Sequence, residues 1–177
     1  MSVPTERPPG PMPPSDGGMR DPRDYIDPRD FASVVHTVLD NNPGMEGRQA
    51  TRITCEAIKF VVAGAMFPEH AMAPSRIVDE GWHALIVHTE LYARLCAKFG
   101  PFVHHTPGYN PMFFDPPILD RTEELIRAAG FEVDEELWVG PTDDRIPVAA
   151  NCQHSPNCQI RPMPKPEKPC TSPGGRA

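Results

Sequence analysis

Apolar residues recur at helical spacing in four stretches of the chain, and prolines, glycines or capping residues bound each stretch. The first, 28–40, follows the cap-then-proline pair Asp27-Pro28 and ends before an Asn-Asn-Pro-Gly turn. The second runs from about residue 46 to residue 67 and ends at Pro68, which cannot continue a helix. No stretch shows the strict alternation that indicates a half-buried strand. The pattern therefore predicts helices.

The third stretch, 75–99, carries the strongest helix signal. Ser75 is a capping residue beside Pro74, and Gly100-Pro101 supplies a terminator. Because this stretch contains no proline and one glycine, the sequence predicts one continuous helix of about seven turns. Its apolar stripe comprises Val78, Trp82, Leu85, Tyr92, Cys96 and Phe99. We expect this helix to be central to the core.

A fourth helix is predicted to begin at Pro116 or Pro117, with Asp115 as its cap and Gly130 as its terminator. Residues 100–111, rich in aromatic residues, glycine and proline, are expected to fold back over the third helix as an ordered loop. An anchoring turn after the fourth helix contains Phe131, Val133, Leu137 and Trp138. The predicted fold class is all-α, a compact bundle of about four helices.

Proline changes this picture at both ends of the chain. The chain has 177 residues and 24 prolines, and these prolines crowd the two ends, where bulky apolar side chains are scarce. The sequence therefore predicts a disordered leader over residues 1–24, a helical domain over 25–139, and a disordered tail with prolines and cysteines over 140–177.

Charge and cysteine usage narrow the class of partner. A net charge of −7 argues against nucleic-acid binding, which requires a concentrated basic surface. Neither a signal peptide nor an apolar run of about twenty residues is visible, so no membrane association is expected. Five cysteines, an odd number, fit a reduced compartment. We expect a cytoplasmic protein whose partner is an unknown small molecule or protein.

The candidate chemistry lies at the start of the third helix. Asp79 and His83, one turn apart, fall roughly opposite the apolar stripe, on the same side as Glu90 and Arg94. One interpretation is a solvated ion pair worth a few tenths of a kcal/mol. The other is a carboxylate–imidazole pair to which the following loop adds one further histidine.

That loop offers His104 and His105. Adjacent side chains in an extended segment point in different directions, so at most one of them is expected to meet His83. Two histidines and one carboxylate suit iron, zinc, manganese or copper and leave positions open for water or substrate. The sequence thus predicts a divalent metal ion, iron or zinc first, held by residues from the set Asp79, His83, His104 and His105.

Other residues in the third helix favour structural roles. His88 lies about 140° around the helix from His83, so it is interpreted as a core histidine hydrogen-bonded to a neighbouring helix. Trp82 is interpreted as a core anchor, and Cys55 and Cys96 as small apolar residues.

These residues also carry a family resemblance. Val78-Asp79 followed by Trp82-His83 resembles the V-D-x-x-W-H signature of the glycine-rich-domain-containing-protein-like family. Further similar positions, which extend the likeness to short actinobacterial proteins, are Pro74, Ser75, Thr89, Tyr92, Cys96, Gly100, His104 and His105. The resemblance covers roughly residues 55–138. Leu85 stands where many longer members have a second histidine, and the glycine-rich domain itself is lacking. The resemblance implies a family and no particular reaction.

The tail holds a second, looser cluster, Cys152, His154, Cys158 and Cys170. Its C-x5-C spacing is wider than that of a usual zinc knuckle, and reactive thiols in an unstructured tail are the alternative. No nucleophile motif, phosphate-binding loop or dinucleotide fingerprint is present. Three functions stay open: a metal-binding protein, a metal-free protein-interaction module that uses the helical domain and the proline-rich ends, and an oxygen-using or hydrolytic enzyme.

Overall fold

The structure, a computed structural model, describes residues 19–105, 115, 117–140 and 146–148. These residues form five α-helices and two short 3-10 turns and contain no β-strand, which confirms the all-α class. The helices are α1 (Pro28–Asn41), α2 (Gly47–Met66), α3 (Arg76–Val87), α4 (Thr89–Phe99) and α5 (Ile118–Ala128), and the turns are η1 (Pro22–Tyr25) and η3 (Glu135–Leu137). Within this part of the chain, no helix combines the length and the apolar content that crossing a membrane would need.

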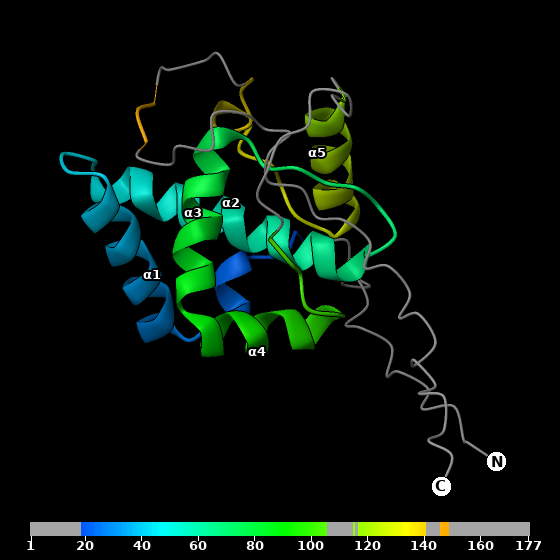
Figure 1. Cartoon of the computed structure of the whole chain (residues 1–177), viewed down its shortest axis with the longest axis horizontal. Helices are drawn as coiled ribbons and strands as arrows, with labels where there is room; N and C mark the ends of the chain where they lie inside the picture. Colours follow the sequence, from blue (N-terminus) through cyan, green and yellow to red (C-terminus); the bar gives the residue numbers. More distant parts are fainter. Residues whose placement is uncertain (1–18, 106–114, 116, 141–145, 149–177) are drawn as a thin grey trace, which may run out of the picture.

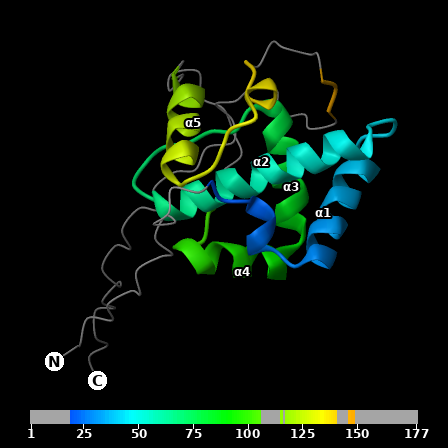
Figure 2. The ribbon, with the colours of Figure 1, turned by 180° about the vertical axis from the view of Figure 1, so that it is seen from behind.

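Helix α2 is the centre of the bundle, because it contacts each of the other four helices (Figures 1 and 2). Its most extensive contact is with α3, and Gly81 makes their close approach possible. A Cβ atom at Gly81 would lie 2.8 Å from the carbonyl oxygen of Ile53 and 2.9 Å from the Cβ of Ala57. The absence of a side chain at Gly81 therefore sets how deeply α3 sits against α2.

The predicted caps are present at the starts of α1 and α3. The Asp27 carboxylate accepts a hydrogen bond from the N–H of Arg29 at 2.8 Å. The Ser75 hydroxyl accepts one from the N–H of Val78 at 3.1 Å and donates one to the Leu137 carbonyl at 2.5 Å. Ser75 thus caps α3 and also ties its first turn to η3.

The prediction of one continuous third helix is wrong, because the chain breaks at His88. This residue ends α3 and begins α4 with φ −85° and ψ 63°, and α4 then turns away from α3 (Figure 1). Ile86, Val87, His88 and Thr89 are all residues of middling helix propensity, so little local energy opposes a break. A contact to α1 favours it, because the ring Nε2 of His88 lies 2.9 Å from the Thr37 hydroxyl oxygen.

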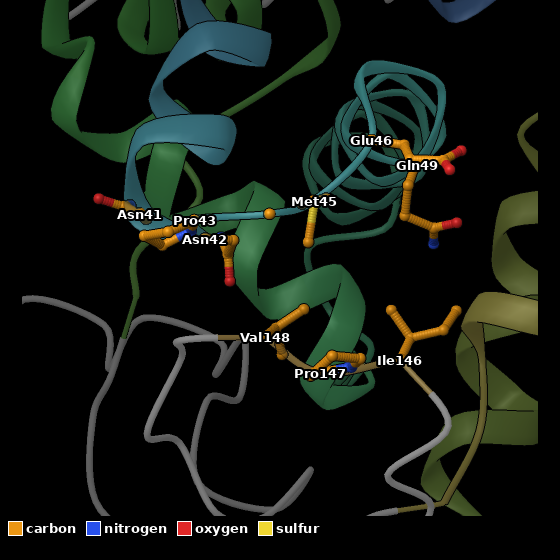
Figure 3. A pocket seen from close by; sticks show the side chains of 10 residues that line it. Asn41, Asn42, Pro43, Met45, Glu46, Gln49, Ile146, Pro147 and Val148 are labelled. Atoms are coloured by element: carbon orange, nitrogen blue, oxygen red, sulfur yellow. The ribbon is translucent and has the colours of Figure 1, made fainter.

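Residues on both sides of the predicted domain limits, 25 and 139, take part in described contacts. Pro22 is buried in η1, and the N–H of Arg20 donates to the Gly130 carbonyl at 2.9 Å. Residues 146–148 lie across from the α1–α2 turn (Figure 3), where the Arg76 guanidinium donates to the Ile146 carbonyl at 3.3 Å. Residues 1–18, 106–114, 116, 141–145 and 149–177 lie outside the described residues. They include most of both predicted disordered ends and the whole cluster of Cys152, His154, Cys158 and Cys170.

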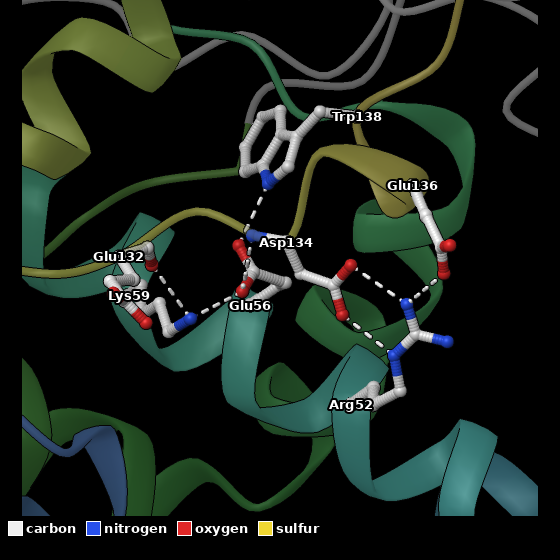
Figure 4. A network of polar contacts seen from close by, with 7 residues as sticks. All are labelled: Arg52, Glu56, Lys59, Glu132, Asp134, Glu136 and Trp138. Carbon is white, nitrogen blue, oxygen red and sulfur yellow. Dashed lines mark hydrogen bonds and ion pairs between the residues drawn. The ribbon is translucent and has the colours of Figure 1, made fainter.

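A charged network with the buried Glu56 at one end anchors the segment after α5 on α2 (Figure 4). Glu56, 1% exposed, accepts hydrogen bonds from Lys59 and from the Trp138 indole N–H, the latter at 2.8 Å. One helical turn earlier, Arg52 binds both carboxylate oxygens of Asp134, at 2.6 and 2.7 Å. The Ser75 hydroxyl, which caps α3, donates to the Leu137 carbonyl in η3. Because the network holds η3 on α2, it also helps to position the start of α3.

Candidate metal site

Three of the four predicted ligand residues meet beside the N-terminal half of α3. Asp79 and His83 come from α3, and His105 comes from the segment after α4; one ligand atom from each lies within 4.8 Å of the other two. The Asp79 Oδ2 is 3.2 Å from the His83 Nδ1, and the Asp79 Oδ1 is 4.0 Å from the His105 Nε2. The two imidazole ring centres are 4.6 Å apart. Residues separated by more than twenty positions in the sequence therefore share one site.

The site is more buried than the helical pattern predicted. Asp79 is 2% exposed, His105 is 15% exposed and His83 is 38% exposed. Of the two interpretations, the solvated helix face does not hold for Asp79, whose side chain is buried and has the His105 ring beside it. Glu90 and Arg94 instead lie exposed on α4, beyond the break, where they pair with each other.

Main-chain geometry selects the tautomer of His83. Its Nδ1 lies 2.8 Å from the main-chain carbonyl oxygen of Asp79, and a carbonyl oxygen can only accept, so the Nδ1–H donates. In the neutral ring the lone pair is then on Nε2, so Nε2 is the nitrogen of His83 that can bind a metal ion.

The two histidines differ in their electrostatic environment. The Asp79 carboxylate raises the pKa of His83, chiefly through their hydrogen bond and in spite of burial. Burial lowers the pKa of His105, and the neighbouring His83 lowers it further. His105 is therefore the more readily neutral of the two rings, which suits a metal ligand.

The loop that carries His105 is held in place by a buried relay of hydrogen bonds. The Trp82 indole N–H donates to the Tyr92 hydroxyl at 2.9 Å, and this hydroxyl donates to the Val103 carbonyl at 2.7 Å. The His105 ring lies against Trp82, with ring centres 4.8 Å apart. Burial also raises the pKa of Tyr92, so the phenol keeps the proton that it donates.

Gly100 allows this loop to start close to α2. A Cβ at this position would lie 2.1 Å from the Ala65 carbonyl oxygen, which no side chain could tolerate. The end of α4 therefore packs directly on the α2 backbone, and the chain can turn back toward α3 within five residues.

The remaining predicted residues take other places. His104 is exposed, packs on Phe102 with ring centres 4.8 Å apart, and is not in the cluster, so the two adjacent histidines diverge as expected. The predicted hydrogen bond from His88 to a neighbouring helix is present, to Thr37 on α1, but His88 is half-buried and not a core residue. Trp82 is fully buried, as expected of a core anchor.

The donor geometry is close to what a small divalent ion requires. Metal–nitrogen and metal–oxygen bonds of about 2.0 to 2.2 Å at tetrahedral angles place ligand atoms about 3.4 Å apart. The three donor atoms here lie within 4.8 Å of one another, so side-chain movements of about 1 Å would close the set. His83, with more than a third of its side chain exposed, has the room to move.

Sequence reasoning missed two polar groups that shape the site. Tyr92 was placed in the apolar stripe, although its hydroxyl makes the relay to the loop. The sequence pattern did not single out Glu56, which is buried and bonded to Trp138. A signal for it exists, because a glutamate three residues after Ile53 and four before Phe60 lies on the apolar face of α2, where a charge needs a partner.

Comparison with known proteins places this site within one family. The UCP032817-like family matches residues 22–112, slightly more than half of the chain, and the chain therefore belongs to that family. The matched stretch includes Asp79, His83 and His105. Searches among curated proteins and among solved structures found no match.

Proposed function

We propose that this member of the UCP032817-like family binds one divalent metal ion through Asp79, His83 and His105, with iron or zinc as the favoured ion. One observation carries the proposal: a carboxylate and two imidazoles from separate segments converge, with donor atoms within 4.8 Å, at a largely buried position. An exposed acidic cluster would carry no such weight, but Asp79 is 2% exposed.

Three protein ligands leave at least one coordination position for water or a small molecule. The partial exposure of His83 puts that position within reach of solvent. Oxygen-using or hydrolytic chemistry would also need a substrate pocket beside the metal site. The two pockets of about 660 and 280 Å³ are lined by residues other than Asp79, His83 and His105, so such chemistry stays a hypothesis. The proposal concerns metal binding alone.

Metal content measured by mass spectrometry tests the proposal directly. The protein is produced without a histidine tag in a host supplied with iron and zinc, and we expect close to one ion per chain. Asp79→Ala and His83→Ala should each lower occupancy at least about tenfold, because losing one ligand of three removes much of the binding free energy.

His104→Ala is the matched control, because it removes an exposed imidazole from the same loop and should leave occupancy unchanged. His88→Ala, which cuts the contact to Thr37, should lower stability and leave the ion in place. Wild-type protein that carries no ion after metal-supplemented expression would end the proposal.

A metal-free interaction module is the second candidate, and a specific observation favours it. The approach of the His105 ring to Asp79, at 4.0 Å, and its packing on Trp82 can tie α3 to its loop with no ion present. Under this alternative, a chelator leaves the melting temperature unchanged, whereas a bound ion stabilises the fold and its removal lowers that temperature.

Predictions about the family likeness, the location and the partner of the protein accompany this proposal. The V-D-x-x-W-H likeness to the glycine-rich-domain-containing-protein-like family and to actinobacterial proteins, the cytoplasmic location, and a small molecule or protein as partner all stay predictions. The acidic net charge of −7 supports the expectation that nucleic acid is not a partner.

A further inference from the structure

One of the three proposed metal ligands lies outside α3. Asp79 and His83 are one turn apart on that helix, whereas His105 lies in the segment 100–105, which follows α4. An ion at this site would therefore join two parts of the chain. When the segment is held against α3, it presents the His105 imidazole at a high effective concentration, and when the segment moves away, the ion keeps two protein ligands. How firmly the segment is held should determine how long the ion stays bound.

The main chain of this segment is bonded to the helices close to the ligand. The carbonyl of Val103, a residue that is 2% exposed, accepts a hydrogen bond from the Tyr92 hydroxyl at 2.7 Å. Val103 comes two residues before His105, which is about 7 Å of extended chain. While this bond is intact, the short connection leaves the His105 ring little freedom to move away from Asp79.

The Tyr92 hydroxyl is itself fixed by the helix that carries the other two ligands. It accepts a hydrogen bond at 2.9 Å from the indole N–H of Trp82, which precedes His83 on α3. Tyr92 belongs to α4, beyond the break at His88, so a single oxygen atom links α3, α4 and the segment 100–105. The hydroxyl therefore helps to set the position of the segment relative to the two ligands on α3.

We propose that Tyr92 is a positioning residue for the metal site: its hydroxyl holds the segment 100–105 against α3, and the bound ion leaves when this segment opens. Tyr92 does not contact the ion, and its effect passes through Val103 to His105. This inference rests on the proposed metal site and adds to it a route of release and the residue that controls that route.

The release of zinc to a chelator tests this inference in the full-length protein. The zinc-loaded protein is mixed with an excess of a colorimetric zinc chelator, and absorbance follows the transfer of the ion. Tyr92→Phe, which loses the bond to Val103, should release zinc about threefold to tenfold faster than the wild type, a factor that corresponds to one hydrogen bond. In both proteins the rate should be independent of chelator concentration, because opening of the segment limits it.

Ile126→Ala is the matched control, because it lowers stability at a different place. Ile126 is fully buried on α5, which packs on α2, and its truncation leaves a cavity in that part of the core. If loss of global stability alone accelerated release, this variant would release zinc as fast as Tyr92→Phe. We expect its release rate to stay within about twofold of wild type.

Hydrogen exchange of the wild-type protein is the decisive measurement should Tyr92→Phe fold poorly. Zinc should slow exchange at the main-chain amides of residues 103–105 by a larger factor than at those of α5. Wild-type protein that binds no zinc would refute the metal site itself. Equal release rates in wild type and Tyr92→Phe, a rate proportional to chelator concentration, or unchanged exchange at residues 103–105 would overturn the role of Tyr92 and leave the metal site standing.

Discussion

The hydroxyl of Tyr92 gives the sharpest test of how the loop is held over α3. Tyr92→Phe removes one oxygen and leaves the ring, which packs on Phe102 with centres 5.1 Å apart. The lost oxygen accepts from the Trp82 indole at 2.9 Å and donates to the Val103 carbonyl at 2.7 Å. The substitution therefore changes hydrogen bonding with almost no change in packing.

The expected cost follows from these two partners. Trp82 is fully buried and Val103 is 2% exposed, so water cannot readily replace the hydroxyl at either group. A buried polar group that loses its partner costs about 1 to 3 kcal/mol, which gives about 2 to 6 kcal/mol for the pair. This is a large part of the 5 to 15 kcal/mol that typically separates folded from unfolded states.

Urea denaturation followed by tryptophan fluorescence measures this loss. With a slope of about 1 to 3 kcal/mol per molar urea, the midpoint should fall by about 1 M or more. Tyr25→Phe is the matched control, because the Tyr25 ring contacts Phe99 and Phe131 while its hydroxyl makes no hydrogen bond within the described residues. It should change stability by less than about 0.5 kcal/mol. Equal losses in the two variants, or none in Tyr92→Phe, would refute the relay.

Further predictions concern packing, charge, pH and chain limits. Gly81→Ala should cost about 1 to 3 kcal/mol in the same urea assay, because the new methyl would lie 2.8 Å from the Ile53 carbonyl oxygen, while Gly47→Ala, with open space around it, should be neutral or stabilising. Glu56→Gln should cost about 2 to 4 kcal/mol by weakening the bonds to Lys59 and Trp138, and an unchanged midpoint would contradict the network. In metal-free protein the raised pKa of His83 predicts that its stabilising contribution is fully present below the ordinary imidazole pKa of about 6.5 and is lost as pH rises through the folded value. The stability difference between wild type and His83→Gln, measured from pH 5 to 8, should shrink with rising pH, and a difference that grew would reverse the assignment of Asp79 as its partner. A chain limited to residues 19–148 should melt at the temperature of the full chain, whereas one that starts at residue 25 should melt lower, because it lacks the Arg20 bond to Gly130.

Local patterns were sufficient where the governing interactions are local. The boundaries of α1 and α2 followed from apolar spacing and from the residues that begin and end a helix, such as Asp27 and Pro68. The pairing of Asp79 with His83 followed in the same way, because residues four apart lie on one helix face whatever surrounds them. The divergence of His104 and His105 needed only the alternation of an extended chain.

Long-range contacts decided the rest. No proline or glycine marks the break at His88, and the sequence could not show that its ring would meet Thr37 on α1. The burial of Asp79 and the choice of His105 over His104 depend on a loop whose path is set by Gly100 against Ala65 and by Tyr92 beneath Val103. Helix periodicity records which side of a helix is apolar, but it carries no information on which distant segment covers the other side. Which segment covers that side is decided only in the folded chain, where all these contacts form together and lower the free energy.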